Sequence, residues 1–244
     1  MNHQEINYQA GSVEFRGYLA YPENAPEKKL PAILVAPTWL GRDEFACQKA
    51  REVAGLGYAA FAVDQYGNGK VAAGPEEAAG LTQPLFIQRA LLQSRIIAAF
   101  ECLCAQPHVD SNQIGGIGFC FGGLMILELL RSGADVKGIV SFHGVLGNHL
   151  GDVVAKPVPI APSIKGAALF LHGYQDPLVT NNDIVNLQKE LTDAQVDWQF
   201  NTYGLAGHSF TNPEQNKKAS GLYFEPKANA RSWEAMKLFF KELF

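Results

Sequence analysis

Hydrophobic positions along the chain follow two patterns that alternate. Short, almost wholly apolar runs such as LPAILVA and YAAFAV stop at Pro or Asp, as strands buried on both faces of a parallel sheet do. Between these runs, longer segments repeat apolar residues at the spacing of an amphipathic helix. This alternation predicts an α/β fold, in which helices cover both faces of a mostly parallel sheet and form a three-layer sandwich.

The strands and helices can be located from these patterns. We expect strands at residues 13–21, 28–39, 58–64, 113–118, 136–142, 167–171 and 197–203. We expect helices at residues 43–56, 84–105, 124–132, 183–194 and 228–244, and an irregular or partly helical stretch at 71–82. No linker or repeat interrupts the pattern, so residues 1–244 are expected to form one domain. Ligands of such a fold bind beyond the carboxyl ends of the strands.

Composition and charge argue against several classes of protein. Hydrophobic residues make up 47% of the 244 positions and charged residues 18%, which suits a packed globule. The formal net charge is -4 and Lys and Arg are scattered, so we expect no nucleic-acid partner. The sequence shows neither the pattern of an export signal nor a run long enough to span a membrane. We therefore expect a cytoplasmic protein without membrane contact.

The four cysteines are expected to be reduced thiols, because the chain has ample core and no export signal; they are Cys47, Cys102, Cys104 and Cys120. Cys102 and Cys104 form a C-x-C pair on an expected helix, where residues two apart point to different sides. No second Cys or His pair has the spacing of a zinc site. We expect neither a metal nor an organic cofactor.

One glycine-rich segment has the pattern of a nucleophile elbow. In GFCFGG, Gly118 and Gly122 stand two residues either side of Cys120, between an expected strand and an expected helix. Glycines at these positions let a sharp turn pass close to neighbouring backbone, so the thiol would stand exposed above the sheet. The alternative is an ordinary strand-to-helix turn with a packed cysteine, since buried Cys and turn Gly are both common.

Two later strand ends favour the elbow. In proteins with such an elbow, the acid and the histidine of a catalytic triad follow the nucleophile, each after a later strand. Asp176 follows the expected strand 167–171, and His208 follows the expected strand 197–203. This order suits acyl transfer, in which His208 takes the proton of Cys120 and Asp176 orients the imidazole.

The motifs GFCFGG, HGYQDPLV and GLAGHSF together resemble the dienelactone hydrolase family, and the likeness covers nearly the whole chain. The resemblance implies an α/β-hydrolase fold and the cleavage of an ester or lactone through an acyl-cysteine. It implies a triad of Cys120, Asp176 and His208. It also implies an oxyanion hole formed by the amides of Phe121 and Trp39, the latter within one residue.

Two features depart from the family's pattern. Pro37 and Thr38 stand where dienelactone hydrolases carry a His-Glu pair, so the glutamate associated with activating the thiol is missing. Asn212 replaces an arginine that holds the substrate carboxylate. Arg89 or Arg95 on the expected long helix could supply another positive contact, with a solvated helix face as the alternative. We therefore expect neutral esters or lactones to be preferred over carboxylate-bearing ones.

Further residues lie near the expected site. His143 and His172 each end a strand and are expected to be structural, and Asp64 is expected to cap a turn. Six aromatic residues in or near the site loops predict an apolar or aromatic pocket: Trp39, Tyr66, Phe86, Phe121, Tyr174 and Phe210. The candidate substrate contacts are Arg89, Tyr174 and Phe210.

The sequence thus predicts a cysteine-dependent hydrolase of small esters or lactones, working without a cofactor as a monomer or homodimer. Its partner would be the small-molecule substrate. The alternative is a catalytically weak hydrolase-fold protein that binds a ligand or senses thiol chemistry, because an unactivated thiol, with a pKa of about 8.5, reacts slowly at neutral pH. The complete triad favours the enzyme.

Overall fold

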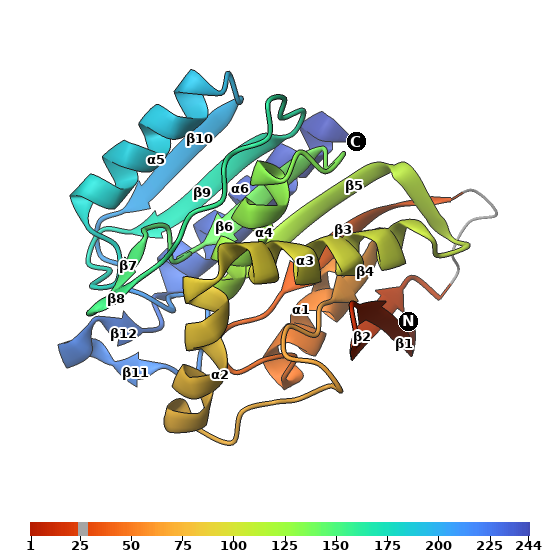
Figure 1. Ribbon diagram of the computed structural model, residues 1–244, viewed down its shortest axis with the longest axis horizontal. Helices are drawn as coiled ribbons and strands as arrows, with labels where there is room; N and C mark the ends of the chain where they lie inside the picture. The colour runs from red at the N-terminus through yellow and green to blue at the C-terminus, as the bar shows by residue number, and fades with distance from the viewer. Residues whose placement is uncertain (24–28) are drawn as a thin grey trace.

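Eight strands form one twisted sheet in the order β1-β2-β4-β3-β5-β6-β9-β10 (Figure 1). The computed structural model describes residues 1–23 and 29–244. The strands are β1 (Asn2–Ala10), β2 (Val13–Tyr21), β3 (Leu30–Ala36), β4 (Ala59–Ala62), β5 (Val109–Phe119), β6 (Gly138–Phe142), β9 (Ala167–Gly173) and β10 (Trp198–Tyr203). All neighbours from β4 to β10 pair in parallel, whereas β1–β2 and β2–β4 are antiparallel. The expected mostly parallel sheet is confirmed.

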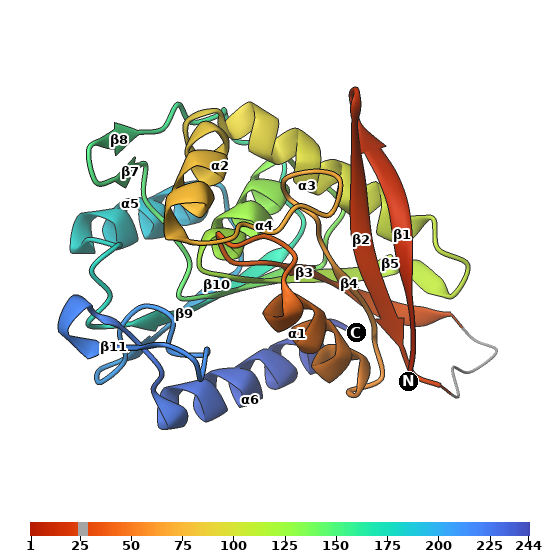
Figure 2. The ribbon, with the colours of Figure 1, turned by 90° about the horizontal axis from the view of Figure 1, so that it is seen from below.

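Helices cover both faces of the sheet (Figure 2). One face carries α1 (Glu44–Ala54) and α6 (Pro226–Leu243), and the other carries α3 (Arg89–Cys104), α4 (Phe121–Arg131) and α5 (Asn181–Asp193). Two hydrophobic clusters, one under each helical layer, make up the core. Because β3, β6 and β9 are buried between these layers, their sequences are continuously apolar instead of alternating. The expected three-layer architecture is confirmed.

The expectation of a single long helix at residues 84–105 is wrong. The chain forms two helices there, α2 (Pro75–Ile87) and α3, which meet at Gln88. Gln88 has φ -99° and ψ 77°, outside the helical region, so the chain bends at this residue. Apolar spacing continues through the bend because both helices pack on the same core, and the periodicity therefore does not reveal it. Pro75 in the first turn, followed by two glutamates, is a signal of a helix start that the sequence analysis did not use.

Several short or exposed strands were also missed. Only one residue of β1 is fully buried, so this edge strand lacks an apolar pattern although it pairs with β2 along its whole length. Two small hairpins lie with α2 near the carboxyl ends of the parallel strands (Figure 1). They are β7 (His149–Leu150) with β8 (Val153–Val154), and β11 (Asn216–Lys217) with β12 (Leu222–Tyr223), the latter joined by the 3₁₀ turn η1 (Lys218–Ser220). In the described part of the chain, no helix is both long and apolar enough to cross a membrane.

Candidate active site

The backbone at Cys120 has the sharp turn of a nucleophile elbow. Cys120 lies between β5 and α4 with φ 56° and ψ -116°. A Cβ at Gly118 would lie 2.1 Å from the Gly122 carbonyl oxygen, and one at Gly122 would lie 2.2 Å from the Ala36 carbonyl oxygen. Both positions therefore require glycine. The turn leaves the side chain of Cys120 partly exposed at the N-terminus of α4, where the helix dipole favours negative charge on the sulfur.

His208 and Asp176 lie together at the ends of neighbouring strands. Asp176 follows β9 and His208 follows β10, and both side chains are buried. His208 Nδ1 lies 2.8 Å from Asp176 Oδ2, while Asp176 Oδ1 accepts a hydrogen bond of 2.8 Å from the Leu178 amide. Among the described residues, His208 Nε2 is buried without a hydrogen-bond partner. Cys120 and His208 line the same cavity, so this nitrogen is available to a thiol or a substrate there.

Charges around His208 favour its protonated form. Burial alone would lower its pKa, but the charge of the Cys120 thiolate and the hydrogen bond to Asp176 outweigh burial and raise the pKa of His208 to about 10. An imidazolium next to a thiolate is the arrangement that makes a cysteine nucleophilic at neutral pH. The local charges therefore offer a way to activate the thiol without the missing glutamate.

The loop that carries His208 is held by the β11–β12 hairpin. The His208 amide donates to the Gly221 carbonyl at 2.7 Å, and the Tyr223 amide donates to the His208 carbonyl at 3.1 Å. The Tyr223 hydroxyl is 2.8 Å from the Leu205 carbonyl on the same loop. The hairpin also contributes Lys217 to the cavity wall. Sequence analysis missed this hairpin because its polar, Lys-rich segment carries no apolar alternation.

The two expected oxyanion donors both line the cavity. Within residues 1–23 and 29–244, neither the Trp39 amide nor the Phe121 amide donates a hydrogen bond to another protein group. By contrast, the Leu40 amide donates to Thr38 Oγ1 at 3.3 Å. The Trp39 carbonyl accepts a hydrogen bond of 2.6 Å from the Tyr66 hydroxyl, which fixes the loop. Two free amides beside a thiol can stabilise an oxyanion.

The cavity has a volume of about 500 Å³ and is mainly apolar. Its walls come from the loop after β3, the start of α2, the elbow, the loop after β6 and the β11–β12 hairpin, and include Leu40, Val145, Leu150, Leu178 and Leu222. Besides His208, Lys217 is the one cationic side chain among its described lining residues. Thr82, on α2, also lines the cavity and lies 2.6 Å from the Tyr66 hydroxyl; sequence analysis did not single it out.

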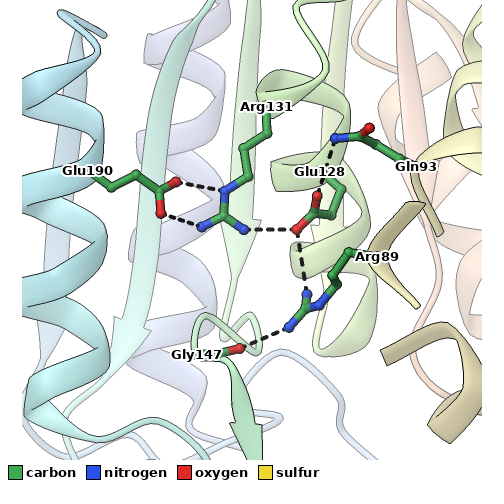
Figure 3. Close-up of polar contacts among 6 residues, drawn as sticks. All are labelled: Arg89, Gln93, Glu128, Arg131, Gly147 and Glu190. Carbon is green, nitrogen blue, oxygen red and sulfur yellow. Dashed lines mark hydrogen bonds and ion pairs between the residues drawn. The ribbon is translucent and has the colours of Figure 1, made fainter. Parts of the chain in front are cut away.

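Three expected substrate contacts lie elsewhere, which corrects the sequence-based assignment. Arg89 is buried against Glu128 and donates to the Gly147 carbonyl at 3.0 Å, in a network with Arg131 (Figure 3). Burial lowers the pKa of Arg89 to about 10, although the charge of Glu128 opposes this. Tyr174 is 70% exposed, and Phe210 is fully buried; neither lines the cavity.

Other sequence candidates also have structural partners. Arg95 donates to the Gln65 carbonyl at 2.6 Å and does not line the cavity. The turn-capping role expected of Asp64 is confirmed, because its carboxylate accepts hydrogen bonds from four backbone amides, those of Arg16, Tyr66, Gly67 and Gly69. The described residues include no group of three or more His, Cys, Asp or Glu side chains placed to hold a metal ion. Their four cysteines form no disulfide.

The likeness to known proteins extends over the whole fold. Residues 15–244 match the model of the dienelactone hydrolase family. The chain belongs to this family. The resemblance stated from its motifs is therefore confirmed.

Related dienelactone hydrolase-like proteins match along nearly their full lengths. A solved structure named "m3DLH" is 40% identical, with a TM-score of 0.90, over 100% of this chain and 98% of that chain. A dienelactone hydrolase-like promiscuous phosphotriesterase from metagenomic libraries is 35% identical, with a TM-score of 0.91, over the same shares. An Aquifex aeolicus protein named "Putative carboxymethylenebutenolidase" is 27% identical over 98% of this chain and 97% of its own length.

Proposed function

We propose that the protein is a thiol-dependent hydrolase of small, neutral esters or lactones, acting as a single-domain cytoplasmic enzyme without a cofactor. Membership of the dienelactone hydrolase family supports ester or lactone hydrolysis. The observation that carries the proposal is the meeting of three groups at one cavity: Cys120 on a strained elbow, His208 hydrogen-bonded to Asp176, and two free backbone amides. These groups suffice for acyl transfer.

The proposed reaction has two halves. In the first, the Cys120 thiolate attacks the substrate carbonyl, and the amides of Trp39 and Phe121 stabilise the oxyanion. His208 then donates the Nε2 proton to the leaving alkoxide, which departs and leaves a thioester on Cys120. In the second half, neutral His208 takes a proton from water, and the hydroxide attacks the thioester. Collapse of the second oxyanion releases the carboxylic acid and restores the thiolate with imidazolium.

The preference for neutral substrates rests on the cavity walls. They are mainly apolar, and the cationic Arg89 is turned toward Glu128 instead of toward the cavity. A carboxylate bound there would lose its hydration, and among the described lining residues it could pair only with Lys217 or with the His208 imidazolium that the reaction itself uses. A neutral acyl group loses less hydration, so it suits this cavity better.

A substrate panel with a thiol control tests the proposal. Purified protein is assayed with nitrophenyl esters, neutral lactones, matched carboxylate-bearing lactones and a phosphotriester, before and after alkylation. The expected result is hydrolysis of the neutral esters or lactones, loss of activity in Cys120→Ala, and a thioester adduct on Cys120 in mass spectra of quenched wild type. Full activity in Cys120→Ala would reject the mechanism. Absence of turnover across the panel, with an intact Cys120, would favour the binding or thiol-sensing alternative.

A further inference from the structure

A second histidine lies directly beside the proposed catalytic groups. His143 follows the last residue of β6, is 1% exposed, and has φ 39°, in the left-handed region that only a few per cent of non-glycine residues adopt, with Asn, Asp and His the commonest of them. Backbone strain of this kind persists only where surrounding contacts hold it, and it is common at functional sites.

Both ring nitrogens of His143 have partners, and the partners define the tautomer. The backbone N–H of Cys120 donates to Nδ1 at 3.2 Å, and it also reaches the Phe142 carbonyl at 3.1 Å. Nδ1 therefore carries a lone pair and no proton. The proton of the neutral ring is then on Nε2, which lies 2.8 Å from Thr211 Oγ1 and donates to it. Burial, followed by the nearby charge of His208, lowers the pKa of His143 well below its ordinary value, in agreement with a neutral ring.

The same ring packs against the histidine loop. Its centroid lies 5.1 Å from that of His208 with an interplanar angle of 66°, and 5.1 Å from that of Phe210 at 81°. Thr211, whose hydroxyl oxygen accepts the hydrogen bond from Nε2, belongs to this loop, three residues after His208. His143 therefore touches the backbone of the nucleophile on one side and the loop of the general base on the other.

We propose that His143 is a positioning residue that links the Cys120 elbow to the His208 loop and sets the distance between thiol and imidazole. The proposal rests on the proposed function, since it concerns the alignment of that nucleophile with that base. The hydrogen bond to the Cys120 amide supports the unusual backbone angles of the elbow, and the neutral ring avoids repelling the His208 imidazolium. An aromatic ring that only filled space would not need a lone pair facing an amide and a proton facing a hydroxyl.

The test compares two substitutions of His143, one that keeps its hydrogen bond to the Cys120 amide and one that keeps only the packing of an aromatic ring. In His143→Asn, Oδ1 can accept the Cys120 N–H in place of Nδ1, and Asn tolerates the left-handed backbone. His143→Phe keeps an aromatic ring but accepts no hydrogen bond. Because small misplacements of reacting groups cost up to about 100-fold in rate, we expect His143→Phe to lower kcat by about 10- to 100-fold with KM within about twofold of wild type. His143→Asn should retain kcat within about fivefold.

A second pair of variants addresses the Thr211 side of the link. Thr211→Ser keeps the hydroxyl, whereas Thr211→Val keeps the shape and removes it. We expect kcat to be lower in Thr211→Val than in Thr211→Ser. The double variant Thr211→Val with His143→Phe should have a kcat no lower than that of His143→Phe alone, since both substitutions break the same hydrogen bond between His143 and Thr211. If circular dichroism shows that His143→Phe does not fold, the comparison of Thr211→Val with Thr211→Ser still tests the positioning role.

The outcomes separate the two proposals. Each variant is assayed with the preferred ester, and the rate of Cys120 alkylation by iodoacetamide is measured in parallel. Wild-type kcat in His143→Phe, equal losses in His143→Phe and His143→Asn, or equal kcat in Thr211→Val and Thr211→Ser would overturn the positioning role. If Cys120→Ala retains activity, the proposed function itself fails, whatever the His143 variants do.

Discussion

The buried charge network around Glu128 gives a quantitative prediction of stability. Glu128 is 2% exposed and lies 2.8 Å from Arg131 and 3.6 Å from Arg89, which is 1% exposed (Figure 3). Arg131 has a second carboxylate in Glu190, at 2.7 Å. Besides Glu128, the described partners of Arg89 are uncharged: the Gly147 carbonyl and the ring of Phe86, whose centroid lies 4.5 Å from the guanidinium carbon. The four side chains carry two charges of each sign. Glu128→Gln therefore leaves Arg89 as a buried cation without a carboxylate.

Breaking a buried ion pair from one side costs about 3–5 kcal/mol, because the remaining charge keeps its desolvation penalty. At about 2–4 °C per kcal/mol for a chain of this size, Glu128→Gln should lower Tm by roughly 6–20 °C. Urea unfolding followed by tryptophan fluorescence gives the free energy of unfolding directly. The matched control is Glu234→Gln on the exposed face of α6, where the pair with Lys237 has 69% and 39% exposed side chains. This control should stay within about 1 kcal/mol of wild type.

A compensating double variant tests the reasoning more sharply. Arg89→Met with Glu128→Leu removes both charges and leaves Arg131 paired with Glu190. Replacing a buried ion pair by apolar residues of similar size is often neutral or stabilising, so the double variant should be more stable than Glu128→Gln alone. A cost below about 1 kcal/mol for Glu128→Gln, or equal costs for Glu128→Gln and Glu234→Gln, would refute the account of Arg89 as a cation that depends on Glu128.

Further predictions concern the site. Asp176→Asn should lower kcat by about 100- to 10,000-fold, because His208 loses its oriented tautomer; unchanged kcat would contradict this. An NMR titration should place the pKa of His208 above its ordinary value in wild type and lower in Cys120→Ala, since the thiolate charge favours the imidazolium. Unfolded His208 loses its proton near pH 6.5, whereas folded His208 keeps its proton up to about pH 10. Stability should thus fall between about pH 6.5 and 10 in wild type, and over a narrower range in Cys120→Ala, where the pKa of His208 is raised less; urea unfolding at several pH values would measure this. Lys217→Met should lower kcat/KM for carboxylate-bearing lactones and leave kcat/KM for neutral esters unchanged. A chelator should leave the rate of ester hydrolysis unchanged.

Local sequence was enough to locate the three side chains of the proposed triad. The elbow could be read from Gly118 and Gly122 because only glycine permits the approach to neighbouring backbone that the turn makes. Asp176 and His208 could be read from their positions after strands, because the ends of neighbouring parallel strands lie at one edge of the sheet. These signals lie within a few residues of each side chain, and they required no knowledge of what packs above the sheet.

The partners of long side chains could not be read in the same way. The sequence favours Arg89 as a substrate contact because it is a cation on a helix near the site, but its guanidinium pairs with Glu128, 39 positions further along the chain. The direction of that side chain depends on where α4 lies against α3. Phe210, likewise, packs on His143 from another strand instead of lining the cavity. Composition and periodicity indicate which face of a helix or strand is apolar, but they do not indicate which residue of another element packs against that face.

The sequence by itself determined the alternation of strands and helices, the elbow at Cys120, and the family. These properties depend on hydrophobic period and on steric limits at single glycines, which act over short stretches of chain. Only the tertiary structure decided the bend at Gln88, the clamp of the β11–β12 hairpin on His208, and the two hydrogen bonds of His143. The bend leaves the apolar spacing unbroken, because both helices pack on the same core. The other two features join separate segments of the chain, and such contacts form only when the sheet and its helices have packed.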